Sequence, residues 1–260
     1  MADIEKKPDK DRLVNRYSNT YKSEITLIWL MSGKQAGLKK IVLLGTTGSG
    51  KTTFLKNLAG DFEGAEVSRN VMLEENQKYN TFTPHAESDF ADSTTTTSLN
   101  AQPILFLITK TNNFEYYLMK KGTWPIDKDI IDCVYPTMVF DPAGQERFEF
   151  MQDIGIQGCD AAFIFADGSN VASIERISKF ITLIKKEAML KIKKIPITIF
   201  VNKKDLESRG LYVGAAAVHR WIEDDEIGIE ETTNLNPETF LIPIRNVLDS
   251  LDGFPITIET

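Results

Sequence analysis

The sequence predicts an α/β fold with a mainly parallel, six-stranded sheet and helices on both faces. Short runs rich in β-branched residues recur along the chain, as in strands that are buried on both sides. Between several of them lie stretches with apolar residues at three- and four-residue spacing, typical of helices that pack on a sheet. Strands alternating with such helices are joined by right-handed crossovers, which makes the pairing parallel.

The predicted strands span 39–44, 104–109, 134–140, 161–166, 196–201 and, more weakly patterned, 226–231. The first is the run Lys39–Leu44, which ends at a glycine. The predicted helices span 51–58, 172–191 and 237–251. The second helix carries one apolar stripe, and the third begins at Pro237, a residue suited to a first helical turn.

The composition is that of a globular protein with an acidic excess. Its 260 residues include 37 acidic and 30 basic side chains, for a formal charge of −7. No nucleic-acid partner is expected, because binding nucleic acid needs cations that displace counterions from phosphates. Cys133 and Cys159 cannot build a disulfide framework and indicate a reducing, cytoplasmic location. The apolar run at 25–31 is far shorter than the ~20 residues that a membrane helix needs.

The domain organisation follows from where the chain becomes polar. Residues 1–37 are polar and are expected to form an N-terminal arm that is partly disordered. Residues 38–258 are expected to form one domain with insertions at about 60–93 and 110–132. Loops longer than about 15 residues are usually functional or disordered.

A phosphate-binding motif follows the first predicted strand. Residues 45–52, G-T-T-G-S-G-K-T, match G-x-x-x-x-G-K-[ST]. Glycines let successive backbone N–H groups point inward, and the following helix adds its positive dipole end. Lys51 is expected between the β- and γ-phosphates, and the Thr52 hydroxyl on Mg²⁺. The motif predicts a nucleoside triphosphate site.

A second motif selects the base. Asn202-Lys203-Lys204-Asp205 directly follows the strand predicted at 196–201. Asp205 can accept both N1–H and N2–H₂ of guanine, whereas adenine offers no such pair and would leave the carboxylate unpaired. Asn202 is expected to brace the loops, and the Lys203 stem to lie over the base.

A third motif lies between these two. The strand at 134–140 ends in D-P-A-G-Q-E-R-F, residues 141–148. Asp141, at a strand end beside the phosphate loop, is placed to hold Mg²⁺ through water, and the Gly144 N–H can approach the γ-phosphate. In this order the three motifs resemble the small GTPase family of Ras, Rab and Arf proteins and their prokaryotic relatives. The resemblance covers about residues 39–251 and implies the P-loop NTPase G domain.

The resemblance implies further roles. Gln145 is then the residue that orients the attacking water, and it lies with Gly144 in the mobile switch II. The threonine that senses the γ-phosphate through Mg²⁺ is expected to be Thr96, with Thr95 and Thr97 as alternatives. Its surroundings resemble the T-I-G-F-N of Arf proteins and the triple threonine of archaeal and bacterial relatives. The other interpretation of this run is a solvated, threonine-rich linker.

The last family motif is the least similar. Residues 231–235, E-T-T-N-L, stand where Rab proteins have E-T-S-A-K, which implies guanine contacts from Thr233 and Asn234. All expected nucleotide contacts are Gly45, Thr47, Gly48, Ser49, Gly50, Lys51, Thr52, Thr53, Gly144, Asn202, Lys203, Asp205, Thr233 and Asn234. The expected magnesium ligands are Thr52, Thr96 and Asp141, and the expected catalytic residues are Lys51, Thr96 and Gln145.

The chain departs from these relatives in the phosphate loop. Thr47 occupies a position that is glycine in Ras proteins, and its β-branched side chain crowds the space of an incoming arginine finger. Arg69 is the one arginine between Lys51 and Thr96, and it is a weak candidate for a finger within the chain. Since an arginine finger is worth roughly 10³ to 10⁵ in rate, slow intrinsic hydrolysis and a GTPase-activating protein are expected.

Spacing is a second departure. Lys51 and Thr96 are 45 positions apart, as are Thr96 and Asp141, whereas compact relatives use about half as many in each interval. The insertions therefore flank switch I, and we expect them to form a surface for effectors that reports the nucleotide state. The alternative is that they are inert. Because residue 2 is Ala2 and the last residues do not match C-a-a-X, no lipid anchor of those kinds is expected.

The predicted function is a Mg²⁺-dependent GTPase switch that binds GTP and GDP. Two alternatives stay open. One is a GTP-binding regulatory or structural subunit with little turnover. The other is a P-loop ATPase or kinase, for which Asn202 and Asp205 would have to be coincidental.

Overall fold

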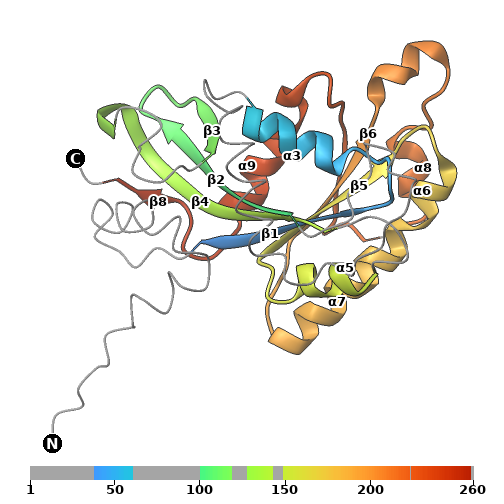
Figure 1. Ribbon diagram of the computed structural model, residues 1–260, viewed down its shortest axis with the longest axis horizontal. Helices are drawn as coiled ribbons and strands as arrows, with labels where there is room; N and C mark the ends of the chain where they lie inside the picture. The colour runs from blue at the N-terminus through green and yellow to red at the C-terminus, as the bar shows by residue number, and fades with distance from the viewer. Residues whose placement is uncertain (1–37, 61–99, 119–127, 143–148, 223, 259–260) are drawn as a thin grey trace, which may run out of the picture.

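The structure is a computed structural model that describes residues 38–60, 100–118, 128–142, 149–222 and 224–258 (Figure 1). Its strands are β1 (Lys39–Gly45), β2 (Asn100–Thr109), β3 (Phe114–Leu118), β4 (Ile131–Asp141), β5 (Ala161–Asp167), β6 (Ile197–Asn202), β7 (Gly228–Glu231) and β8 (Ile256–Thr257). Its α-helices are α3 (Lys51–Gly60), α5 (Glu149–Ile156), α6 (Val171–Glu175), α7 (Ile177–Lys191), α8 (Ala215–His219) and α9 (Leu241–Asp249). Short 3₁₀ helices are η2 (Lys128–Ile130), η4 (Lys204–Arg209) and η5 (Pro237–Phe240).

One sheet organises these elements. Its strand order is β3-β2-β4-β1-β5-β6-β7, and β8 pairs with β4. The five strands from β4 to β7 in this order are parallel, while β2, β3 and β8 pair antiparallel with their neighbours. The predicted α/β class with a mainly parallel sheet is confirmed.

The sheet has eight described strands, not the six that were predicted. One extra strand is β3, which lies inside the segment 110–132 that was interpreted as an insertion outside the strand–helix alternation. Its aromatic residues favour an extended backbone, and it pairs with β2 from Ile104 to Ile108. The other is β8, two residues long, which is too short for any periodicity to show.

Side chains on the two faces of β1 explain why helices cover both sides. Ile41 and Leu43 join the core under α3 and α9, whereas Val42 and Leu44 join the core under α5, α6 and α7. Figure 1 shows these two helical layers on opposite sides of the sheet. Alternation along a buried strand produces both contacts from one apolar run. Both cysteines are buried and free, as expected for core residues.

The helix predicted over 172–191 is two helices that meet at Arg176. The apolar pattern continues across the break because Ile174 and Ile177 are both buried, so periodicity did not reveal it. The first helix, α6, is capped by Asn170, whose side-chain oxygen accepts a hydrogen bond from the Ala172 N–H at 3.0 Å. The segment predicted as a helix over 237–251 likewise begins as the 3₁₀ turn η5 before α9.

None of the described helices combines the length and apolar character needed to span a bilayer.

The core on the α3 and α9 side contains a cluster of phenylalanines centred on Phe200. Its ring lies 5.0–6.3 Å, centroid to centroid, from the rings of Phe54, Phe163, Phe165 and Phe240. We predict that Phe200→Ala lowers the free energy of unfolding by about 3–5 kcal/mol, because it leaves a cavity among these rings. Urea unfolding measures this. Ile242→Ala, at a side chain that is 73% exposed, should cost less than about 0.5 kcal/mol, and equal losses would contradict the packing described.

Candidate guanine-nucleotide site

The loop between β1 and α3 has the backbone that a phosphate chain requires. Gly45, Gly48 and Gly50 have φ of 141°, 78° and 101°, a region that side chains rarely adopt. A Cβ at Gly45 would lie 2.3 Å from the Phe165 carbonyl oxygen. Glycine is therefore required at this position both by conformation and by space.

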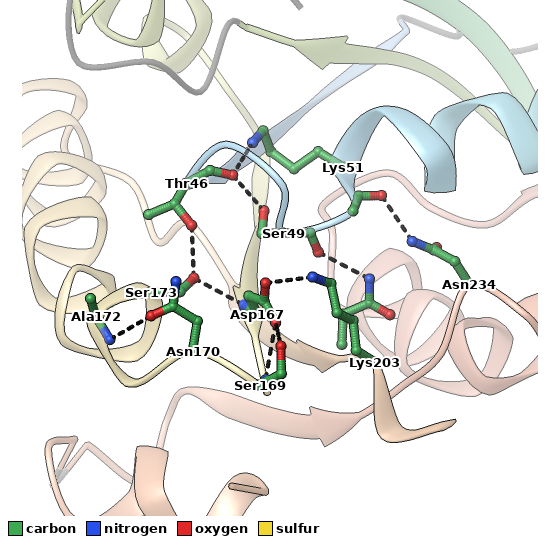
Figure 2. Close-up of polar contacts among 12 residues, drawn as sticks. Thr46, Ser49, Lys51, Asp167, Ser169, Asn170, Ala172, Ser173, Lys203 and Asn234 are labelled. Atoms are coloured by element: carbon green, nitrogen blue, oxygen red, sulfur yellow. Dashed lines mark hydrogen bonds and ion pairs between the residues drawn. The ribbon is translucent and has the colours of Figure 1, made fainter. Parts of the chain in front are cut away.

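Lys51 is bonded back to the phosphate loop. Its side chain is buried, and its Nζ donates a hydrogen bond to the Gly45 carbonyl oxygen at 2.8 Å. A second bond, to the Thr46 carbonyl oxygen at 3.0 Å, is drawn in Figure 2. Burial lowers the pKa of Lys51 to about 8, against the opposing attraction of Asp141. A buried ammonium that is desolvated in this way is poised to take an anionic partner.

Thr52 and Asp141 form the candidate magnesium site. The Thr52 hydroxyl donates a 2.7 Å hydrogen bond to Asp141 Oδ2. The carboxylate is fully buried, and its Oδ1 has no hydrogen-bond partner among the described residues. Burial raises the pKa of Asp141, while Lys51 and the Thr52 hydrogen bond act in the opposite direction. A buried, unpartnered carboxylate oxygen beside a hydroxyl fits a cation.

The donor set also suits Mg²⁺ in particular. Within the described ranges, no group of three or more His, Cys, Asp or Glu side chains could hold a metal. Mg²⁺ is usually bound through one or two carboxylates together with phosphate oxygens and water, not by a cage of protein ligands. The Asp141 carboxylate and the Thr52 hydroxyl, next to the phosphate loop, form such a donor set.

The residues expected to recognise the base follow β6. Asn202, the last residue of β6, donates from Nδ2 to the Ser49 carbonyl oxygen at 3.0 Å and so braces the phosphate loop as expected. Asp205 lies in η4, where its Oδ1 accepts a 2.6 Å hydrogen bond from the Thr233 hydroxyl. The hydrogen bond from Thr233 orients the Asp205 carboxylate.

Lys203 makes a contact that the sequence did not indicate. Its backbone is left-handed, with φ of 71°, and its Nζ lies 2.5 Å from Asp167 Oδ2. Burial opposes ionisation of Asp167, but hydrogen bonds from Lys203 and Ser169 outweigh it and hold the pKa of this carboxyl below its usual value. Asp167 thereby fixes the lysine side chain on which the base is expected to rest.

Asp167 and Ser173 are site residues that sequence reasoning missed. The Ser173 hydroxyl accepts a 2.9 Å hydrogen bond from the Asp167 N–H and shares a 2.7 Å hydrogen bond with the Thr46 hydroxyl (Figure 2). The sequence placed Asp167 directly after a predicted strand, but its position opposite Asn202 follows from the β5–β6 register, which the sequence does not show. The sequence did not indicate a role for Ser173. It lies in α6, and the pattern that predicts this helix comes from its apolar residues.

Several expected residues lie outside the described ranges or at the surface. Thr95, Thr96, Thr97, Gly144 and Gln145 belong to the first group, as does Arg69. Thr47 and Thr53 are described and exposed, on the loop and on α3.

The Lys203–Asp167 pair predicts a pH dependence. Because the folded-state pKa of Asp167 is depressed, its stabilising effect is present above the unfolded value of about 3.9 and is lost as the pH falls through the folded value. We expect Asp167→Asn to destabilise the protein at neutral pH and this difference to shrink below about pH 4. Urea unfolding between about pH 7 and pH 3 tests this, with Asp252→Asn, an exposed position, as the matched control. A difference that stays constant over that range would refute the ion-pair explanation.

Comparisons with known proteins agree with this geometry. Residues 127–239 match the family model described as the Ras family, a range that includes Asp141, Asp205 and Thr233. The chain is 31% identical over 78 residues to the Ras-like protein rasU of Dictyostelium discoideum. That alignment covers 30% of this chain and 35% of the relative, about a third of the relative's length. Together with the α/β sheet and the loop between β1 and α3, these matches support the assignment of the chain to the small GTPase family.

Proposed function

We propose that this protein is a guanine-nucleotide switch that binds GTP and GDP with Mg²⁺ and hydrolyses GTP. The observation that carries the proposal is the position of Asp205 in η4, just after β6, where its carboxylate accepts a hydrogen bond from the Thr233 hydroxyl. Asn202, the last residue of β6, donates a hydrogen bond to the phosphate loop. A base held at Asp205 and phosphates held by residues 45–52 would thus belong to one nucleotide.

The chemistry of Asp205 selects guanine. Its two carboxylate oxygens can accept from N1–H and N2–H₂, and the alternative of an ATPase or kinase leaves the carboxylate without donors. The hydrogen bond from Thr233 at 2.6 Å restricts the carboxylate before any ligand arrives. A preoriented acceptor lowers the entropy that binding must overcome.

The phosphate end is supported by Lys51, Thr52 and Asp141. Lys51 would exchange its two carbonyl partners for phosphate oxygens. The negative phosphate would then stabilise the lysine charge, which burial disfavours. Thr52 and Asp141 would hold Mg²⁺, which supplies charge neutralisation at the phosphates when it is bound. In this arrangement the chain contributes positioning and electrostatic stabilisation, as phosphoryl transfer requires.

Hydrolysis is proposed from the sequence alone. Gln145 would orient the attacking water, and Thr96 and Gly144 would contact the γ-phosphate end, so that hydrolysis releases their loops. Thr47 is exposed on the phosphate loop, where its side chain would crowd an incoming arginine finger. Because such a finger accelerates hydrolysis strongly, we propose that turnover without a GTPase-activating protein is slow. The same observation is compatible with the second candidate, a GTP-binding subunit with little turnover.

The insertions and the location complete the proposal. Part of the segment 110–132 is the sheet strand β3, so we propose that the partner surface for effectors includes this edge of the sheet. A cytoplasmic location is proposed from the two free cysteines.

Guanine specificity is tested by Asp205→Asn. Xanthine carries a carbonyl where guanine has N2–H₂, so an asparagine amide can pair with it while losing one acceptor for guanine. We expect GDP affinity to fall by at least about 100-fold and xanthosine diphosphate to become the preferred ligand. Isothermal titration with both nucleotides measures the switch, and Asp225→Asn, an exposed position, should bind GDP as the wild type does. An unchanged preference for GDP would remove Asp205 from the base site.

Turnover is tested by Gln145→Leu. If Gln145 positions the water, single-turnover GTP hydrolysis should slow by at least about tenfold while GTP affinity stays unchanged. Gln157→Leu, the same substitution at an exposed position of the chain, should hydrolyse GTP at the wild-type rate. Equal rates for Gln145→Leu and the wild type would leave the nucleotide-binding subunit as the function.

A further inference from the structure

Asn234 joins the two loops that hold opposite ends of the nucleotide. Its Nδ2 donates a 3.1 Å hydrogen bond to the Gly50 carbonyl oxygen, and Figure 2 shows this amide reaching the start of α3. In the other direction, Asn57 of α3 donates from Nδ2 to the Asn234 carbonyl oxygen at 2.9 Å. Side chain and backbone of one residue are thus bonded to α3 and to the loop before it.

The contact depends on close approach at Gly50. A Cβ at Gly50 would lie 2.5 Å from Asn234 Nδ2 and 2.1 Å from Asn202 Nδ2. Two side-chain amides therefore converge on the same stretch of phosphate loop, Asn202 on the Ser49 carbonyl and Asn234 on that of Gly50. Asn202 comes from the base motif after β6, and Asn234 from the loop after β7.

This chain has an asparagine, Asn234, at this position. The similar Rab motif has alanine there, which has no amide to donate across the site. Stability alone does not account for the asparagine, because its Oδ1 is buried with no hydrogen-bond partner among the described residues. An unpartnered buried acceptor is destabilising, so the amide is held for the bond that its nitrogen makes.

We propose that Asn234 is a positioning residue that couples the base loop to the phosphate loop and so slows nucleotide release. This inference rests on the proposed function. A nucleotide that bridges two loops of fixed separation gains its second contact at high effective concentration, and preorganisation lowers the entropy lost on binding. For the base loop to move away from the phosphates, the Asn234 and Asn57 bonds must break together.

The test is release of a fluorescent GDP, mant-GDP, from the full-length protein in magnesium buffer with excess unlabelled GDP. Asn234→Ala should release mant-GDP about tenfold faster than the wild type, as expected for the loss of one partly buried hydrogen bond. Asn57→Ala, which leaves residues 231–235 unchanged, should also accelerate release. Asn113→Ala is the matched control, because Asn113 is an exposed asparagine in the turn between β2 and β3 and belongs to neither nucleotide loop. It should release within about twofold of the wild type.

A second measurement separates coupling from a merely structural role. Guanosine reaches the base loop alone and pyrophosphate the phosphate loop alone, so their competition constants should change by less than about twofold in Asn234→Ala, while GDP affinity falls about tenfold. Equal losses for guanosine, pyrophosphate and GDP would overturn the coupling, as would wild-type release from both variants. Wild-type protein that retains no mant-GDP would instead overturn the proposed function and this inference with it.

Discussion

Parallel pairing of β4, β1, β5, β6 and β7 is the constraint on which the rest of the molecule depends. Because parallel strands end at one edge, their last residues must be neighbours in space. Those last residues are Gly45, Asp141, Asp167, Asn202 and Glu231. One edge of the sheet thus brings together residues that are far apart in the sequence. They are Gly45 of the phosphate loop, the candidate magnesium ligand Asp141, Asp167, which pairs with Lys203, and Asn202, which is bonded to the phosphate loop.

At that edge the phosphate loop is kept in shape by its neighbours. Ser173 bonds the side chain of Thr46, Asn202 bonds the Ser49 carbonyl, and Asn234 bonds that of Gly50. The remaining polar atoms are less well satisfied, since Asp141 Oδ1 and Asn202 Oδ1 are buried without partners among the described residues. These buried polar atoms without hydrogen-bond partners lie at the candidate nucleotide site. Functional sites are where proteins usually keep such destabilising groups.

The sequence predicts a site most readily where its residues form one contiguous motif at the end of an apolar strand. Residues 45–52 and Asn202–Asp205 could be located because the buried runs before them are unmistakably strands. Asp167 and Ser173 could not, because their roles depend on the β5–β6 register and on how closely α6 approaches Thr46. The break at Arg176 was hidden for a different reason: burial on the same face continues through it. β8 could not be predicted because two residues carry no pattern, and its place depends on pairing with Cys133 and Val134.

The short reach of β3 determines what the sheet offers to another chain. β3 pairs with β2 from Ile104 to Ile108, whereas β2 pairs with β4 from Asn100 onward. In the described sheet, β2 therefore extends beyond the β3 ladder over Asn100–Pro103, the part that lies opposite the Asp141 end of β4, and at Thr109 beside the turn. Pro103 has no N–H to donate, so in this stretch the backbone N–H groups belong to Asn100, Ala101 and Gln102. A strand added at this corner of the described sheet would find a shorter and less regular hydrogen-bonding edge than β2 presents to β3.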